Sequence, residues 1–381
     1  MQQDKKNFIW NLLGLTVNNF NSLFFLVIVQ RINGINFTGM FSYGYAVACV
    51  LYMLSLFFNR SFQISEEKCS DKAFIILRLS TCILSLIISI GIAFLSFKSL
   101  PKFFIIILLC LFRNIEAASD VFYGIVHKRG RLDYSGKSLF TKGILGILVF
   151  LTVDYFTKNL IITILSLISV NIIGICVDIL FTKYICKKNS LPKLKTCTNS
   201  EIKAQVVKAF KQSFPVFIFS TLGLLLLNMQ KYIIGLFYDD AIGAVFNIIV
   251  MPATVMTLCG TYFINPFLSK LKDYFAELDM KMFCKLNGKL LLILFCIGLF
   301  VCFVAWVIGI KIMEIVFGME LKQYNLFICV IIFSSIFYAL SSLLSASLTI
   351  MEKNKSQSVI YAVVAFTTAI VSFFTMRSEE H

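Results

Sequence analysis

Eleven stretches of about 20 mostly apolar residues follow one another along the chain. A helix of this length crosses the hydrocarbon core of a bilayer and satisfies its own backbone polar groups there. Only 14% of the 381 residues are charged, too few to cover a water-soluble fold of this size. The sequence therefore predicts an all-α polytopic membrane protein with helices at residues 8–30, 40–58, 74–97, 103–126, 139–157, 160–182, 213–236, 242–268, 286–310, 323–350 and 357–376.

The basic residues lie between these apolar stretches and concentrate in every second interval. The densest interval, residues 183–211, contains eight lysines. Lysine and arginine in short loops mark the cytoplasmic side of a membrane protein. The N-terminus is therefore predicted to be cytoplasmic. The net charge of +15 follows from membrane topology and does not indicate a nucleic-acid partner.

The sequence has few of the residue patterns that nucleotide binding, metal binding or catalysis would require. The segment GRLDYSGKS resembles a phosphate-binding loop, but five residues instead of four separate Gly130 from Gly136, and no strand precedes it. ATP binding is therefore not predicted. The 12 cysteines have no metal-ligand spacing, and the chain has only two histidines. We expect no cofactor, no metal site and no enzymatic activity.

The longest hydrophilic interval, residues 183–212, predicts the domain organisation. It separates an N-terminal lobe of six helices, residues 1–182, from a second lobe of five helices, residues 213–381. Within the interval, Thr198 and Glu201 form a capping-box pattern, and apolar residues then recur every fourth position. This pattern predicts a short amphipathic helix, which either directs its lysines toward anionic lipid or is a solvated linker.

The fourth predicted helix carries charges at membrane depth. Arg113, Glu116 and Asp120 are spaced i, i+3 and i+7, so they share one helix face. One interpretation is that Arg113 and Glu116 neutralise each other and fix helix packing. The other is a cavity wall, in which Arg113 binds a phosphate or carboxylate and Glu116 or Asp120 binds a coupling proton.

Other polar residues within or beside the predicted spans are weaker candidates. Lys231 either extends to the outer interface or lines the same cavity. The amides of Asn18, Asn171 and Asn228 either hold helices together or bind sugar hydroxyls. Two arginines flank the first large cytoplasmic loop and are expected to contact lipid phosphates at the cytoplasmic entrance, namely Arg60 and Arg78.

Three stretches resemble the polysaccharide-unit flippases of the multidrug/oligosaccharidyl-lipid/polysaccharide (MOP) exporter superfamily. They are FFNRSFQIS at 57–65, RNIEAASDVFYGIVHKRGRLDYSGKSL at 113–139, and NMQKYIIGLFYDDAIGAVFNIIVMPATVM at 228–256. The second contains the family's D-x-x-Y-G pattern followed by a basic loop and G-K-S-L, matched here by Asp120, Tyr123, Gly124, Gly136, Lys137 and Ser138. In the third, Asn228, Lys231 and Tyr232 are kept, whereas Gln230 and Gly235 replace the family's proline and aspartate.

The resemblance implies two helix bundles in a MATE-like V around a central cavity, usually with twelve helices where this sequence shows eleven. It also implies transport of undecaprenyl-pyrophosphate-linked oligosaccharide repeat units across the bacterial inner membrane for O-antigen or capsule synthesis, coupled to an ion gradient. The implied partners are the lipid-linked oligosaccharide, membrane lipids, a polysaccharide polymerase and a chain-length regulator. Two alternatives stay open: a multidrug cation antiporter, or another membrane protein of the polysaccharide pathway.

Overall fold

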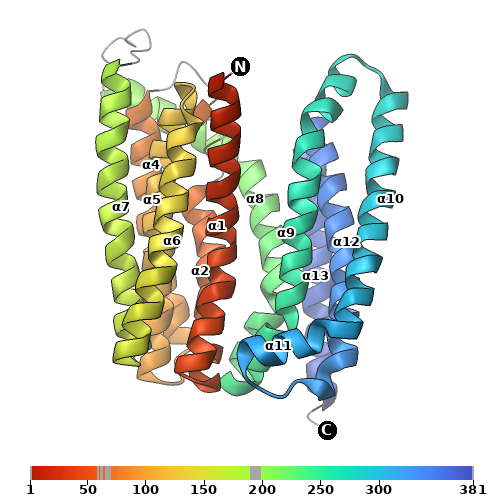
Figure 1. Cartoon of the computed structure of the whole chain (residues 1–381). Coiled ribbons are helices and arrows are strands. Elements are labelled where there is room, and N and C mark those ends of the chain that lie inside the picture. Colours follow the sequence, from red (N-terminus) through yellow and green to blue (C-terminus); the bar gives the residue numbers. More distant parts are fainter. Residues whose placement is uncertain (1, 58–59, 61–62, 65–69, 189–198, 380–381) are drawn as a thin grey trace. The chain divides into compact units, whose positions relative to one another are not determined.

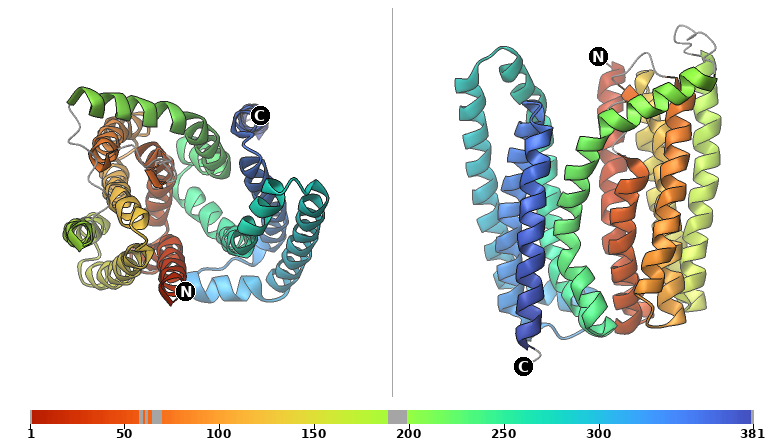
Figure 2. Two further views of the ribbon diagram at one scale, coloured as in Figure 1. Left: turned by 90° about the horizontal axis from the view of Figure 1, so that it is seen from above. Right: turned by 180° about the vertical axis from the view of Figure 1, so that it is seen from behind.

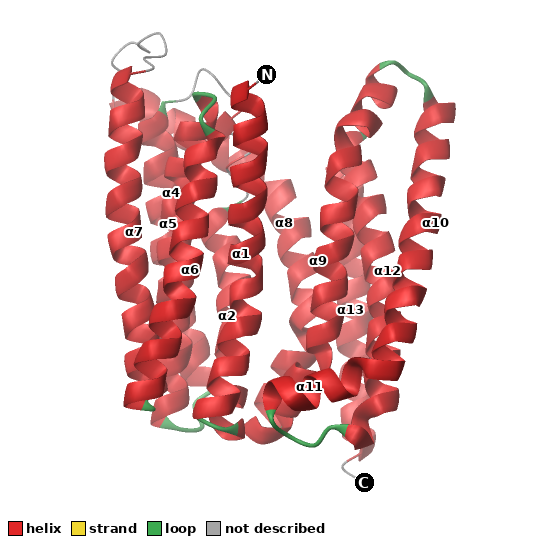
Figure 3. Ribbon diagram, in the orientation of Figure 1, coloured by secondary structure: helices red, strands yellow, loops and turns green. Residues whose placement is uncertain are grey.

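A computed structural model describes the chain except for residues 1, 58–59, 61–62, 65–69, 189–198 and 380–381. The described part is helical and contains no strand (Figure 3). The helices are α1 (Gln2–Ile32), α2 (Ile35–Leu56), α4 (Asp71–Leu95), α5 (Leu100–Lys128), α6 (Leu132–Thr157), α7 (Leu160–Lys188), α8 (Asn199–Phe237), α9 (Asp240–Ala276), α10 (Met280–Val304), α11 (Ile310–Phe317), α12 (Asn325–Ile350) and α13 (Asn354–Glu379) (Figure 1).

The predicted helical membrane architecture is confirmed. Each of the eleven predicted spans coincides with a long helix, and nine helices of the described chain are long and apolar enough to cross a bilayer. Helix α5, with its three charges, is not among the nine, and α13 offers only a shorter apolar stretch, Lys355–Val371. Helix α5 is less apolar than the other spans because it carries charged groups, which must find partners inside the protein.

The chain packs into two compact units. The first unit comprises Met1–Gly243 with Ala362–His381, and the second comprises Ala244–Tyr361. Part of the predicted linker, 189–198, lies outside the described residues. The predicted short amphipathic helix is not separate, because α8 continues for 39 residues through the span predicted at 213–236, with Pro215 inside it. The domain boundaries at 182 and 213 stay a prediction.

The apolar stripe of the first half of α8 packs against protein. Val206 and Ala209 join Phe74, Leu77 and Val121 of α4 and α5 in one hydrophobic cluster. The ring of Phe210 stacks on Phe57 at 4.6 Å, and the Gln205 side chain accepts hydrogen bonds from the backbone and hydroxyl of Ser70. This stripe therefore packs in part against α4 and α5 (Figure 2), and the predicted direction of the lysines toward lipid or solvent stays a prediction.

Glycines bring α1 and α6 of the first unit into close contact. A Cβ atom added at Gly14 would lie 2.3 Å from the carbonyl oxygen of Gly136, and one added at Gly136 would lie 2.2 Å from the backbone of Trp10. Small residues allow membrane helices to approach to backbone contact, where packing forces replace the hydrophobic effect. Gly136 of the G-K-S-L pattern therefore has a structural role at this crossing.

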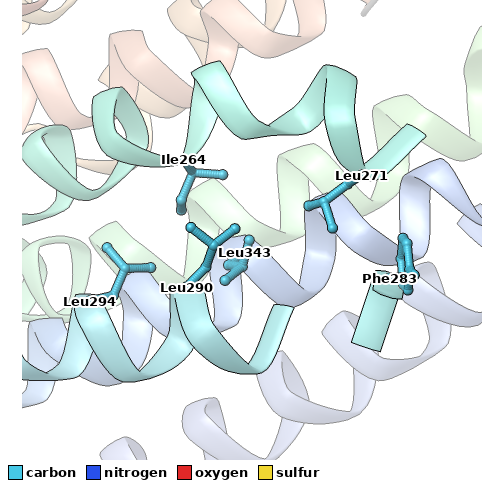
Figure 4. Packing of buried hydrophobic residues seen from close by; sticks show 6 residues of the cluster. All are labelled: Ile264, Leu271, Phe283, Leu290, Leu294 and Leu343. Atoms are coloured by element: carbon cyan, nitrogen blue, oxygen red, sulfur yellow. The ribbon is translucent and has the colours of Figure 1, made fainter. Parts of the chain in front are cut away.

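The second unit is packed around an apolar core. Buried side chains of α9, α10 and α12 form it, namely Ile264, Leu271, Phe283, Leu290, Leu294 and Leu343 (Figure 4). Its buried polar residues are amides and hydroxyls, exemplified by Asn287, whose side-chain oxygen accepts a 2.6 Å hydrogen bond from Ser347. The buried charged residues of the described chain all belong to the first unit. Charge-based chemistry is therefore expected in the first unit.

Candidate functional site

A cavity of about 250 Å³ lies within the first unit, among α1, α2, α5, α6, α7 and α8. The charged face of α5, with Arg113, Glu116 and Asp120, forms part of its wall. The remaining wall is mostly polar and aromatic, and consists of Leu15, Asn18, Asn19, Cys49, Tyr52, Met53, Arg60, Ser119, Tyr123, Leu139, Lys142, Asn171 and Leu224. The cavity is therefore lined by charged and polar side chains together with apolar surface.

Arg113 and Glu116 are paired and also line the cavity. Nη1 of Arg113 donates to Oε2 of Glu116 at 2.5 Å, and the guanidinium lies 5.0 and 4.8 Å from the ring centres of Tyr45 and Tyr52. Its Nη2 contacts the sulfur of Cys49 at 3.5 Å. Cation–π contacts of this kind stabilise a desolvated cation. The two interpretations offered for this helix face are therefore compatible, although substrate binding by Arg113 stays a prediction.

Asp120 binds two arginines. Its Oδ2 accepts from Nη2 of Arg78 at 3.0 Å, and its Oδ1 accepts from Nη1 of Arg60 at 3.1 Å. Arg78 is 2% exposed and also donates to the carbonyl of Ser55 at 2.9 Å. The expected contact between Arg78 and lipid phosphate is therefore wrong, since its guanidinium is enclosed by protein. Arg60 lines the cavity, 5.9 Å from the ring of Tyr123.

The D-x-x-Y-G pattern has a structural explanation. Asp120 holds the two arginines, and Tyr123 shares a 3.0 Å hydrogen bond with Ser138. Gly124 leaves room for Gln63, because a Cβ at this position would lie 2.2 Å from the Gln63 side-chain oxygen. Gln63 donates to the carbonyl of Val121 at 3.0 Å. This contact anchors the described part of the segment after α2 on α5, near Arg60.

A second ion pair at the cavity, between Lys142 and Asp178, was not predicted from the sequence. Nζ of Lys142 donates to Asp178 at 2.5 Å, to Ser119 at 2.9 Å and to Tyr123 at 3.1 Å. Ser138 donates to the other oxygen of Asp178 at 2.6 Å. Lys142 lies near the start of the predicted span 139–157, and α6 carries it into the bundle. Asp178 lies within the predicted span 160–182, and an acid at such depth is itself a signal of function.

Gly174 of α7 makes room for Lys142. A Cβ atom there would lie 2.2 Å from Cε of Lys142, so the aliphatic stem of the lysine crosses the backbone of α7 at this point. Asp178 follows Gly174 by four residues, which places both on the same face of α7. The glycine and the aspartate therefore together position the ammonium group at the cavity wall.

The remaining candidates divide between the cavity and other positions. Asn18 and Asn171 line the cavity, and the amide of Asn171 donates to the Leu167 carbonyl at 3.1 Å. Asn228 and Lys231 are not part of the lining, and no described carboxylate forms an ion pair with Lys231. Their proposed contacts with substrate stay predictions.

The site supplies several kinds of binding groups. Guanidinium, ammonium, phenol and amide donors face the chamber, which suits recognition of an anionic group next to hydroxyl-rich groups. Among the residues that the structure describes, no group of three or more histidine, cysteine, aspartate or glutamate side chains lies together as a metal site would require.

Comparison with solved structures defines the class of fold. The described chain resembles an outward-facing multidrug resistance MATE family transporter of the MOP superfamily, with a TM-score of 0.51 and 14% identity over 99% of this chain and 96% of the other. A MOP superfamily transporter from Pyrococcus furiosus matches with a TM-score of 0.47 and 12% identity, over 95% and 84% of the two chains. The protein is thus an all-helical, multi-pass membrane protein with a MATE-like fold.

Comparison with known sequences gives a distant relative. The capsular polysaccharide biosynthesis protein CapF of Staphylococcus aureus is 23% identical over 372 residues, which cover 97% of this chain and 91% of CapF. No protein-family model matches the sequence. The similarity runs over nearly the whole length of both proteins, so it includes the cavity-forming helices as well as the second unit.

Proposed function

We propose that this protein is a transporter that moves a lipid-linked oligosaccharide with an anionic phosphate-bearing headgroup across the bacterial inner membrane. The cargo class is an undecaprenyl-pyrophosphate-linked repeat unit of a capsule or O-antigen, and the expected partners are the polymerase and chain-length regulator that act next. The observation that carries the proposal is the cavity of the first unit, with arginine and lysine side chains at its wall. The full-length similarity to CapF supports a polysaccharide cargo.

The chemistry of the wall supports this class of cargo. A phosphate inside a bilayer requires cationic hydrogen-bond donors, and arginine supplies them in a planar fork that matches phosphate oxygens. Asn18 and Asn171 offer amides, and Tyr52 and Tyr123 offer aromatic faces and hydroxyls for sugars. The hydrocarbon tail needs no polar partner, since it is soluble in the bilayer itself.

The charge pairing of the wall argues against a multidrug cation antiporter. An organic cation inside a bilayer is bound by aromatic faces and, for charge balance, by a carboxylate that is available to it. Glu116 is paired with Arg113, Asp120 with two arginines, and Asp178 with Lys142. Each cavity carboxylate of the described residues therefore already has a protein cation, so an organic cation would have to displace an arginine or a lysine.

Transport by the purified protein in liposomes tests the proposal. Liposomes would carry a lipid-linked oligosaccharide with a fluorescent sugar, and a membrane-impermeant quencher would report how fast the sugar reaches the other leaflet. Wild-type protein should accelerate this movement. The double variant Arg113→Gln/Glu116→Gln should slow it, because the cavity wall loses the charged guanidinium of Arg113. Both partners of the ion pair are neutralised together, so no charge is left unpaired.

The matched control is Arg129→Gln/Asp71→Asn, which neutralises a 3.0 Å ion pair outside the cavity lining. This variant should transport at the wild-type rate. Efflux of a cationic dye would be measured with the same liposomes. Dye transport without movement of the labelled glycan would reject the proposal in favour of the antiporter.

A further inference from the structure

Three clusters of opposite charges among the described residues include side chains of the cavity wall, and one of the three is unbalanced. Arg113 with Glu116 is a one-to-one pair, as is Lys142 with Asp178. At Asp120, however, two arginines share one carboxylate. Within the described residues, this cluster is therefore the place where the cavity wall carries an excess positive charge.

The two arginines at Asp120 differ in their access to the cavity. Arg78 is 2% exposed and is enclosed by Asp120 and the carbonyl of Ser55, whereas the Arg60 side chain is 27% exposed and lines the chamber. A buried guanidinium requires a counter-charge, which Asp120 supplies. Because the charge of Asp120 is already balanced by Arg78, the charge of Arg60 is left available to a ligand.

We propose that Arg60 binds the phosphate group of the cargo, and that Arg78 is a positioning residue. Arg78 neutralises the negative charge of Asp120, so that the positive charge of Arg60 stays available to the phosphate. This inference deepens the proposed function and rests on it for the identity of the cargo. The chemistry it assigns is an anionic phosphate or pyrophosphate, either free or as a lipid headgroup. Arg78 acts without touching the ligand.

The charge balance predicts the behaviour of two single variants. Arg60→Gln leaves the ion pair between Arg78 and Asp120, and Arg78→Gln leaves the ion pair between Arg60 and Asp120. Each variant therefore retains one neutral ion pair and leaves no buried charge without a partner. The carbonyl of Ser55 keeps a second donor, the hydroxyl of Thr81 at 2.8 Å. Both variants should lower the affinity for pyrophosphate about tenfold or more, because a charged hydrogen bond contributes about 1.5–3 kcal/mol.

A double variant separates charge balance from structural support. Arg78→Gln/Asp120→Asn removes both partners and leaves Arg60 uncompensated again. Affinity should then return to within about threefold of wild type. If Arg78 merely supported the packing of α4 and α5, the added Asp120→Asn change would not restore binding. The conservative variant Arg78→Lys keeps the buried charge and should bind like the wild type.

A second cluster in the first unit provides the matched control. Arg131 and Lys137 share Asp133, at 3.0 and 3.8 Å, outside the cavity lining. The hydrogen bond to Asp133 raises the pKa of Arg131, a loop residue beyond the membrane, above its ordinary value. Lys137→Gln removes one positive charge from this two-to-one cluster. It should leave pyrophosphate affinity unchanged, although it alters the protein's net charge as the test variants do.

Binding would be measured by calorimetry on the full chain in nanodiscs, with inorganic pyrophosphate, geranylgeranyl pyrophosphate and the uncharged alcohol geranylgeraniol as probes. Binding of either pyrophosphate with the predicted order of variants supports the inference, and a preference for the prenyl compound identifies a lipid headgroup as the source. Unchanged affinity in Arg78→Gln, or no recovery in the double variant, overturns it. Pyrophosphate binding in this order without glycan movement in liposomes would reject the proposed transport and leave the anion site standing.

Discussion

The ion pair between Lys142 and Asp178 allows a sharp stability prediction. Both groups are largely buried, with side chains 11% and 5% exposed, and their charged atoms are 2.5 Å apart. The test uses Lys142→Met, Asp178→Asn and the double variant. Each single variant leaves one charge in a low-dielectric bundle without its partner, whereas the double variant leaves none.

The expected magnitudes follow from the contacts that remain. Removing one partner of a buried pair costs about 3–5 kcal/mol. In Asp178→Asn, Lys142 keeps the hydroxyls of Ser119 and Tyr123 as acceptors, so the loss should be near 3 kcal/mol. In the double variant the loss should fall to about 1 kcal/mol, because an apolar replacement of a buried ion pair is often close to neutral.

The free energy of unfolding would be measured by titrating the purified protein in mixed micelles with a denaturing detergent while following helix content by circular dichroism. The double-mutant cycle should give a coupling energy of about 5 kcal/mol or more, because each single variant loses about 3 kcal/mol or more and the double variant only about 1 kcal/mol. Equal losses in the double variant and in the sum of the two single variants would refute the argument that Lys142 and Asp178 stabilise each other.

Two further predictions concern helix packing. Gly14→Ala should destabilise the first unit by about 1–3 kcal/mol, because its Cβ would meet the backbone of Gly136 at 2.3 Å, whereas Gly91→Ala meets no atom within 4 Å and should not destabilise it. In the second unit, Asn287→Ala removes the hydrogen bond from Ser347 and should cost about 0.6 kcal/mol in the same unfolding assay. The first argument would be contradicted if Gly91→Ala lowered the free energy of unfolding as much as Gly14→Ala. The second would be contradicted if Asn287→Ala caused no loss in an assay with a precision of about 0.2 kcal/mol.

The helices and the charged face of α5 could be predicted from sequence alone. A bilayer fixes the length and apolarity of each span, and a helix fixes which residues share a face, so the positions of the spans and the grouping of Arg113, Glu116 and Asp120 follow from local rules. The continuity of α8 could not be predicted from the sequence. Its first half is hydrophilic and its second half is apolar, so the sequence indicates two separate elements where the structure has one helix.

Tertiary structure decided which charges are paired and which face the cavity. Sequence spacing reaches only i to i+7 along one helix, whereas Arg78 meets Asp120 across 42 residues and Lys142 meets Asp178 across 36. Arg60 and Arg78 looked equivalent beside the same loop, yet one lines the cavity and the other is enclosed. The sequence by itself determined a helical membrane protein with polar groups at depth; packing between helices determined their partners, because the energy of a buried charge depends on groups that the chain brings together only on folding.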